Sequence, residues 1–264
     1  MSQLWISTEG QQPIVAVALH DGHYVRSQVE QLLAISADER QREEDPFTAA
    51  WTEIAETRLV VLRSRFEVDL NRPRHRAIYL KPEDSWGLQV WKEQPPQDLI
   101  EQTLAEYDAF YAKVGQICQT LEQRYGRFVI YDIHTYNHYR QGMHASPAEE
   151  LYNPEINLGT GTLDREYWQP VVERFIYDMR HFDFLGRQLD VRENVKFAGG
   201  HFAKWIHTHF PDSACVLSVE VKKFFMSEWT HQLDLAKMSA VHQALKSSVS
   251  GVLEELQHLS KVSA

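Results

Sequence analysis

The stretch Pro13-Ile14-Val15-Ala16-Val17-Ala18-Leu19, followed directly by His20, decides the expected fold. It is a short apolar run with several β-branched side chains, which is typical of a strand that is buried on both faces. Residues 128–131 and 214–221 form two further runs of the same kind. Strands of this type belong to sheets that are covered by helices, so the sequence predicts an α/β fold.

Helices are expected between these strands. Residues 99–123 carry apolar side chains at helical spacing and are followed by Gly126, and residues 24–43 and 167–187 also have a helical pattern. A chain of 264 residues is long enough for two domains, but it also fits one large α/β domain. We expect a single domain over residues 1–264.

Composition and charge exclude several classes of partner. The formal net charge is −10, which argues against nucleic acid, because phosphate binding needs a basic face. The first residues lack a basic region followed by an apolar core, and no long uncharged apolar run occurs, so we expect a cytoplasmic protein that does not enter membranes. Only Cys118 and Cys215 are present, so any metal must be held by histidines and carboxylates.

Histidines follow two of the expected strands. His20-Asp21-Gly22-His23 comes after the first, and Asp132-Ile133-His134 comes after residues 128–131. Ligands of open α/β sheets bind beyond the carboxyl ends of the strands, so two strands that deliver histidines there indicate a metal site. Asp132 is a candidate for orienting an imidazole through its second nitrogen. The alternative for the first motif is a turn with exposed histidines.

A cluster of arginines lies in the strand-like run of residues 64–73. Arg65, Asn71 and Arg72 combine two guanidinium groups and an amide, which is the chemistry of a carboxylate-binding site. The alternative is a strand edge whose arginines are solvated or paired with Glu67 and Asp69. The run by itself does not separate these interpretations.

Two single acids are further candidates. Asp45 lies in a charged cluster that ordinarily would be a solvated helix end, but His20 precedes it at a strand end. Glu220 interrupts an apolar strand, where a carboxylate is costly unless it is paired or functional. Its alternative role is a buried ion pair with Lys222 or Arg192.

These motifs together resemble the N-formylglutamate amidohydrolase family, whose fold is similar to zinc carboxypeptidases and to the succinylglutamate desuccinylase and aspartoacylase group. They span most of the chain in the order expected for that family. The matching elements are His20 with Gly22, residues 64–73, Asp132-Ile133-His134, Asn157-Leu158-Gly159, Gly199-Gly200, and Glu220 followed by Phe225-Met226.

The resemblance implies a mixed, mostly parallel central sheet of the zinc-exopeptidase type and one bound Zn²⁺. The family's ligands map onto His20 and His134. The third ligand is Asp45 in the amidohydrolase pattern. His23 is the alternative, because it stands where the carboxypeptidase-like pattern has a Glu three positions after the first His.

The same resemblance assigns catalytic roles. Glu220 would take a proton from the zinc-activated water and return it to the leaving amine. Arg65 would stabilise the oxyanion, while Asn71 and Arg72 would hold a carboxylate of the substrate. The expected reaction is hydrolysis of an N-acylated acidic amino acid, with N-formyl-L-glutamate giving L-glutamate and formate.

Two alternatives remain open at this point. The pocket could take other N-acyl amino acids or peptide C-termini, or the chain could be a carboxylate-binding protein that holds no metal. Residues 82–96, which are rich in Pro, Trp and acidic side chains, are expected to form a surface loop or lid. The sequence leaves the oligomeric state open.

Overall fold

Within residues 3–262, which the computed structural model describes, one central sheet contains seven strands in the order β1-β3-β2-β4-β7-β5-β6. The neighbours β2-β3, β2-β4, β4-β7 and β5-β6 are parallel, and β1-β3 and β5-β7 are antiparallel, so the sheet is mixed. The strands are β1 Trp5–Thr8, β2 Ile14–Ala18, β3 Thr57–Val61, β4 Phe128–Tyr136, β5 Ile156–Gly159, β6 Val191–Glu193 and β7 Ala214–Lys222.

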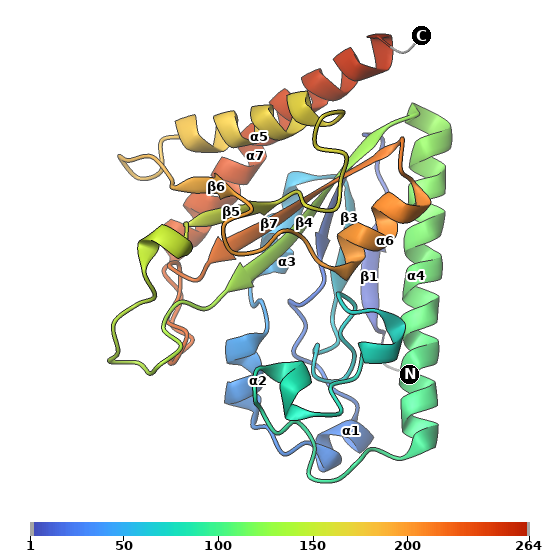
Figure 1. Cartoon of the computed structure of the whole chain (residues 1–264), viewed down its shortest axis with the longest axis vertical. Helices are drawn as coiled ribbons and strands as arrows, with labels where there is room; N and C mark the ends of the chain where they lie inside the picture. Colours follow the sequence, from blue (N-terminus) through green and yellow to red (C-terminus); the bar gives the residue numbers. More distant parts are fainter. Residues whose placement is uncertain (1–2, 263–264) are drawn as a thin grey trace.

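Helices cover both faces of the sheet in a single α/β domain (Figure 1). Helices α4 (Gln97–Tyr125) and α6 (His201–His209) pack on one face, and α3 (Thr48–Trp51), α5 (Gln169–His181) and α7 (Leu235–Val262) pack on the other. The short element η1 (Thr52–Ile54) follows α3 in the same layer, where Ile54 belongs to its apolar cluster. The remaining elements lie outside these two layers and are α1 Ser27–Leu32, α2 Ala37–Glu43, η2 Arg74–Arg76, η3 Pro82–Ser85 and η4 Glu150–Tyr152.

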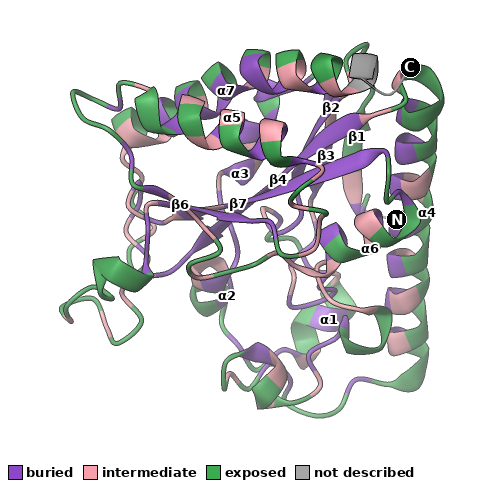
Figure 2. Ribbon diagram, turned by 45° about the horizontal axis from the view of Figure 1, so that its top comes forward, coloured by how far each residue is buried: buried purple, intermediate pink, exposed green. Residues whose placement is uncertain are grey.

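Side chains that alternate along each strand pack against the two layers of helices. In β2, Ile14 and Ala16 belong to the apolar cluster with α5 and α7, whereas Val15 and Val17 belong to the cluster with α4 and α6. Figure 2 shows the strands buried and the outer faces of the helices exposed. Burying each valine or isoleucine side chain stabilises the folded state by about 1.5–3 kcal/mol. The apolar runs, from which strands buried on both faces were predicted, therefore account for this layered core.

The structure changes two expected boundaries. The strand expected at residues 128–131 continues to Tyr136, so Asp132 and His134 lie within β4 rather than beyond its end. The helix expected over residues 24–43 is wrong as one element: α1 and α2 are separate, and Ser36 caps α2 through a capping box with Glu39. Helix α1 ends at Leu32, where the chain becomes extended, and the polar cap at Ser36 begins α2.

The strand-like interpretation of residues 64–73 is wrong. The backbone amides of Glu67 and Val68 both donate to the carbonyl oxygen of Ser64, at 3.0 and 3.3 Å, and the amide of Arg72 donates to the carbonyl of Asp69 at 3.3 Å. These are consecutive turns after β3. The alternating polar pattern therefore does not mark the two faces of a strand: Arg65, Asp69 and Asn71 line the cavity described below, whereas Glu67 pairs with arginines.

Residues 82–96 are anchored to the body of the protein. Val90 and Trp91 are buried, and the indole nitrogen of Trp91 donates to the carbonyl of Tyr79 at 2.9 Å. Trp86, in the left-handed region at φ 56°, is half-exposed at the cavity described below. Whether this segment closes over a substrate stays a prediction.

Among the helices of residues 3–262, none combines the length and apolar character that crossing a lipid bilayer requires. The expectation about a leader depends in part on Met1 and Ser2, which lie outside the described residues.

Candidate metal centre and active-site cavity

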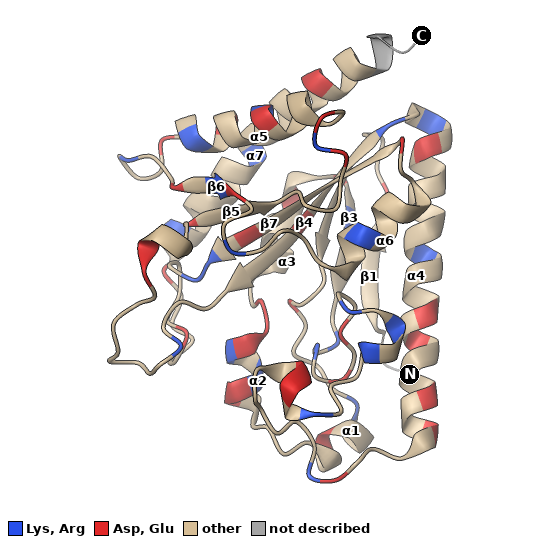
Figure 3. Ribbon diagram, in the orientation of Figure 1, with Lys and Arg blue, Asp and Glu red and all other residues tan. Residues whose placement is uncertain are grey.

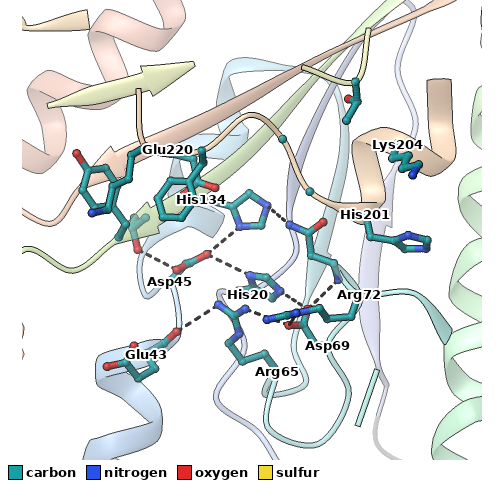
Figure 4. A pocket seen from close by; sticks show the side chains of 18 of the residues that line it. His20, Glu43, Asp45, Arg65, Asp69, Arg72, His134, His201, Lys204 and Glu220 are labelled. Carbon is teal, nitrogen blue, oxygen red and sulfur yellow. Dashed lines mark hydrogen bonds and ion pairs between the residues drawn. The ribbon is translucent and has the colours of Figure 1, made fainter. Parts of the chain in front are cut away.

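A cavity of about 1260 Å³ opens at the carboxyl ends of β2, β4 and β7. It brings together the side chains that the sequence predicted from distant segments, and Figure 4 shows most of them converging on one point. The predicted residues that line it are His20, Asp45, Arg65, Asn71, Arg72, His134 and Glu220.

Three of these residues form a buried cluster. His20 follows β2, His134 lies in β4, and Asp45 comes from the loop between α2 and α3, which returns to the sheet because the Asp45 amide donates to the carbonyl of His20 at 2.9 Å. One ligand atom from each of the three lies within 4.8 Å of the others. In Figure 4, Asp45 lies beside the two imidazoles and is joined to each by a dashed line.

The geometry of the cluster fits a metal ion. The Nδ1 atoms of His20 and His134 lie 3.3 and 2.9 Å from one carboxylate oxygen of Asp45. Ligands held about 2 Å from a tetrahedral zinc lie about 3.3 Å from one another. The Nδ1 atom of His20 is buried and has no hydrogen-bond partner among the described residues. Two imidazoles and one carboxylate match the three-ligand sets of catalytic zinc, which leave one position open.

The outer nitrogens of both imidazoles are held by carboxylates. Nε2 of His20 lies 2.8 Å from Asp69, and Nε2 of His134 lies 3.0 Å from Asp132. Carboxylates in this position fix the ring and leave the other nitrogen free for a metal. Asp132 occupies the place that the sequence suggested, whereas Asp69 entered the sequence interpretation only as a partner for arginines.

Buried negative charge surrounds the cluster. Burial by itself raises the pKa of Asp45, but a hydrogen bond with His134 and positive charge on His20 and His134 hold it well below the usual range. Burial also raises the pKa of Asp69, but the positive charges of Arg65 and His20 outweigh this effect and lower the pKa well below its usual range. The carboxylates are therefore anionic, and a cation among them would be stabilised.

His23, the alternative ligand, lies outside the cluster. Its side chain is 43% exposed, and its Nδ1 atom contacts the carboxylate of Glu44 at 2.6 Å. The two histidines of the first motif therefore do not meet. The loop turns sharply after His20, and Gly22 passes so close to the backbone of Leu62 that a Cβ atom there would lie 2.2 Å from its carbonyl carbon.

Glu220 faces the cavity beside the cluster. It is the register partner of His134 across the parallel pair β4-β7. The suggested ion pairs are absent within residues 3–262, because Lys222 donates to the carbonyl of Asn153 at 2.9 Å and Arg192 pairs with Asp190 at 2.9 Å. Burial raises the pKa of the Glu220 carboxyl to about 7.

Arg65 is paired with an acid, as one interpretation of its segment predicted, and also lines the cavity, as the other predicted. It pairs with Asp69 at 3.0 Å, donates to the hydroxyl of Tyr79 at 3.1 Å and lies 4.9 Å from the ring centroid of Trp86. Glu67 is likewise paired, with Arg26 and Arg63. Because Arg65 is braced on one side and lines the cavity on the other, its guanidinium is held in place for an anion.

Asn71 links the cluster to α6. Its Oδ1 atom accepts from the amide of Phe202 at 2.9 Å, and its Nδ2 atom lies 3.3 Å from Nε2 of His134. Gly200 makes this possible, since a Cβ atom there would lie 2.2 Å from Asn71 Oδ1. Arg72 lies 3.8 Å from Asp69 and keeps 30% of its side chain exposed in the cavity.

Several lining residues were not predicted. Lys223 is buried and donates to the carbonyl oxygens of Arg42 and Glu44 at 2.6 and 2.7 Å, which holds the segment that carries Asp45. The signal available in the sequence was a lysine three positions after Glu220 on the same strand end. The other unpredicted basic residues of the lining are Arg140, Lys196, His201, Lys204 and His209.

Comparisons with known proteins agree with the fold described above. The fold is similar to that of an N-formylglutamate amidohydrolase from Ralstonia eutropha JMP134, with a TM-score of 0.72 and 14% identity over 97% of this chain and 98% of that one. It is also similar to a gene product from Agrobacterium tumefaciens, with a TM-score of 0.64 and 18% identity over 95% and 96% of the two chains. No curated protein matches the sequence.

The family is established at the level of sequence. A family model described as N-formylglutamate amidohydrolase matches residues 12–225, a range that includes the three clustered residues, Arg65, Arg72 and Glu220. This range covers more than half of the chain, so the chain belongs to the N-formylglutamate amidohydrolase family.

Proposed function

We propose that the chain is a zinc-dependent amidohydrolase that cleaves N-formyl-L-glutamate to L-glutamate and formate. The observation that carries the proposal is the buried cluster of His20, Asp45 and His134, with Glu220 beside it in the same cavity. Membership of the amidohydrolase family supports the reaction class. We further propose that residues 1–264 act as one catalytic domain with a mostly parallel sheet of the zinc-exopeptidase type.

His20, Asp45 and His134 would hold the zinc ion, with Asp69 and Asp132 orienting the two imidazoles. When bound, zinc supplies a Lewis acid that polarises the scissile carbonyl and acidifies the attacking water. All three residues line the cavity, which leaves room beside them for the amide of a substrate.

Glu220 acts as the general base and then as the general acid. Its carboxylate takes a proton from the attacking water as the new C–O bond forms at the formyl carbon. The same carboxyl group then gives that proton to the leaving amine nitrogen when the C–N bond breaks. A pKa near neutrality serves both directions of transfer, and burial supplies it.

Arg65 and Arg72 bind different groups of the substrate. The guanidinium of Arg65 is fixed by Asp69 and Tyr79, so it stabilises negative charge on the carbonyl oxygen without reorganising. Arg72, which is more exposed and has a longer contact with Asp69, binds the α-carboxylate. Asn71 also lines the cavity, and its amide nitrogen would donate to the same carboxylate, while its Oδ1 atom accepts from the first turn of α6.

This division predicts different kinetic effects for the two arginines. Arg72→Ala should raise KM for N-formyl-L-glutamate about thirtyfold with kcat changed less than threefold, because it removes a contact made equally in the ground and transition states. Arg65→Ala should lower kcat about a hundredfold with little change in KM. Steady-state kinetics of both variants measures the difference, and Arg74→Ala, a change at an exposed arginine paired with Asp108, is the control.

The pKa of Glu220 predicts the pH dependence. Burial raises the pKa to about 7, and a nearby divalent cation lowers it, so the base titrates at or below about 7. The deprotonated form is the active base, so kcat should be constant above this pKa and fall about tenfold per pH unit below it. A pH profile of kcat tests this, and a kcat that rises as the pH falls from 7 to 5 would contradict the assignment.

The proposal is tested by a substrate screen. The zinc-loaded protein should release amine from N-formyl-L-glutamate faster than from its N-acetyl and N-succinyl analogues, and a chelator should abolish the release. Faster hydrolysis of the N-acetyl or N-succinyl analogue would show that N-formyl-L-glutamate is not the preferred substrate. Carboxylate binding that is insensitive to the chelator, without hydrolysis of any analogue, would replace the enzyme with a binding protein.

A further inference from the structure

The side chain of Arg72 is held less firmly than that of Arg65. Its Nε atom lies 3.8 Å from Asp69, and one of its terminal nitrogens donates to the carbonyl of Asp84 at 3.4 Å. Both distances exceed the usual range of N–H···O hydrogen bonds, which is about 2.7–3.2 Å. The backbone that carries Arg72 must therefore determine much of where its guanidinium lies in the cavity.

This backbone is held from outside its own segment. The carbonyl of Leu70 accepts from the hydroxyl of Tyr111 at 2.7 Å, and the carbonyl of Arg72 accepts from the hydroxyl of Tyr107 at 2.9 Å. Both tyrosines belong to α4, and Figure 3 shows basic residues on the loop beside this helix. Between the two carbonyls lies Asn71, whose side chain is held by α6. The two residues assigned to the substrate's carboxylate thus stand on a backbone that α4 and α6 fix.

The two tyrosines are buried and form one unit. They are four positions apart in α4, so they lie on the same face of the helix, and their ring centroids are 4.7 Å apart. Burial raises the pKa of Tyr107 to about 12 and raises that of Tyr111 well above its ordinary value, so both hydroxyls keep their protons at neutral pH. Phenylalanine would preserve the ring packing, but it would leave a buried carbonyl without its donor.

We propose that Tyr107 and Tyr111 are positioning residues for substrate binding, which place Arg72 through its backbone so that its guanidinium meets the substrate's carboxylate. This rests on the proposed function, in which Arg72 binds that carboxylate. Neither tyrosine is among the residues that line the active-site cavity, so both act through the backbone and do not touch the substrate. The effect of their hydroxyls should appear in substrate affinity, since the contact made by Arg72 is the same in the ground and transition states.

Steady-state kinetics tests the two hydroxyls separately. Tyr107→Phe should raise KM for N-formyl-L-glutamate about tenfold with kcat changed less than about twofold, because the carbonyl of Arg72 itself is released. Tyr111→Phe releases the carbonyl two residues earlier and should raise KM about fivefold. The control is Tyr131→Phe, because Tyr131 is equally buried and its hydroxyl lies 3.1 Å from that of Ser248, away from the cavity lining. It should leave both constants within about twofold.

Combination with Arg72→Ala separates positioning from a merely structural role. If Tyr107 acts through Arg72, then Tyr107→Phe should change KM less than about twofold once the guanidinium is absent. A loss of kcat as large as the rise in KM would mean that the hydroxyl supports the site as a whole, and it would overturn the proposal. A rise in KM that is undiminished in the Arg72→Ala background would overturn it as well.

Binding without turnover separates this proposal from the proposed function. Calorimetry of the zinc-loaded protein with L-glutamate should show about tenfold weaker binding in Tyr107→Phe, and no such difference in the Arg72→Ala background. If the protein hydrolyses no amide but shows this pattern, the function fails and the positioning role stands. Hydrolysis of N-formyl-L-glutamate with the same KM in the wild type and both tyrosine variants leaves the function standing and overturns the positioning role. A protein that neither hydrolyses an amide nor binds L-glutamate overturns both.

Discussion

Glu220→Gln is expected to retain zinc and to lose at least about a thousandfold in kcat on N-formyl-L-glutamate, with KM within threefold of the wild type. The glutamine has nearly the same shape, so it should preserve the packing of β7 beside His134. It has no basic oxygen at neutral pH and can neither take the proton of the water nor return one to the amine. The effect should therefore appear in turnover and not in binding.

The control for this variant is Glu193→Gln. Glu193 lies in β6 of the same sheet, but it pairs with Arg165 at 2.7 Å and does not line the cavity. Its substitution should leave kcat within a factor of two. A Glu220→Gln protein with near-normal kcat would remove Glu220 from the mechanism, whereas a loss of zinc would mean that this carboxylate is itself a ligand.

Asp45→Asn is expected to weaken zinc binding by roughly a thousandfold, because the metal loses one of three protein ligands and the neighbouring negative charge. Asp69→Asn should weaken it only about 10–100-fold, since Asp69 orients His20 without reaching the metal. Competition with a chromophoric chelator measures both affinities. The ranking distinguishes a ligand from the residue that supports one.

His23→Ala decides between the two candidates for the third ligand. His23 is 43% exposed and pairs with Glu44 outside the cluster, so its loss should change zinc affinity less than threefold. A drop comparable to that of Asp45→Asn would transfer the ligand role to His23. Circular dichroism spectra of the variants check that each one is folded.

The sequence was informative wherever a residue conflicts with its local pattern. His20 and His134 were singled out because they follow apolar strands, where α/β sheets bind ligands. Glu220 was singled out because a carboxylate inside an apolar strand is costly to bury. Arg65 and Arg72 were found in the same way, although their segment forms turns instead of a strand. Helix α4 was predicted well because its apolar periodicity is long and ends at Gly126.

Features that depend on tertiary contacts could not be read from local patterns. Asp45 reaches the cluster only because its loop returns to the carbonyl of His20 after two short helices. Strands β1, β5 and β6 have only four, four and three residues, too few for a periodic signal. Arg140 and Lys196 lie in irregular segments, where no spacing indicates that they meet in one cavity.

The central claim, that His20, Asp45 and His134 hold a catalytic zinc ion, is tested most directly by metal-dependent turnover of N-formyl-L-glutamate. The protein is stripped with a chelator, dialysed and titrated with Zn²⁺ while glutamate release is followed. We predict no activity in the stripped protein and full activity at one zinc per chain, with no recovery in Asp45→Asn at that zinc concentration. Full hydrolysis by the stripped protein, or none at any zinc concentration, would contradict the account.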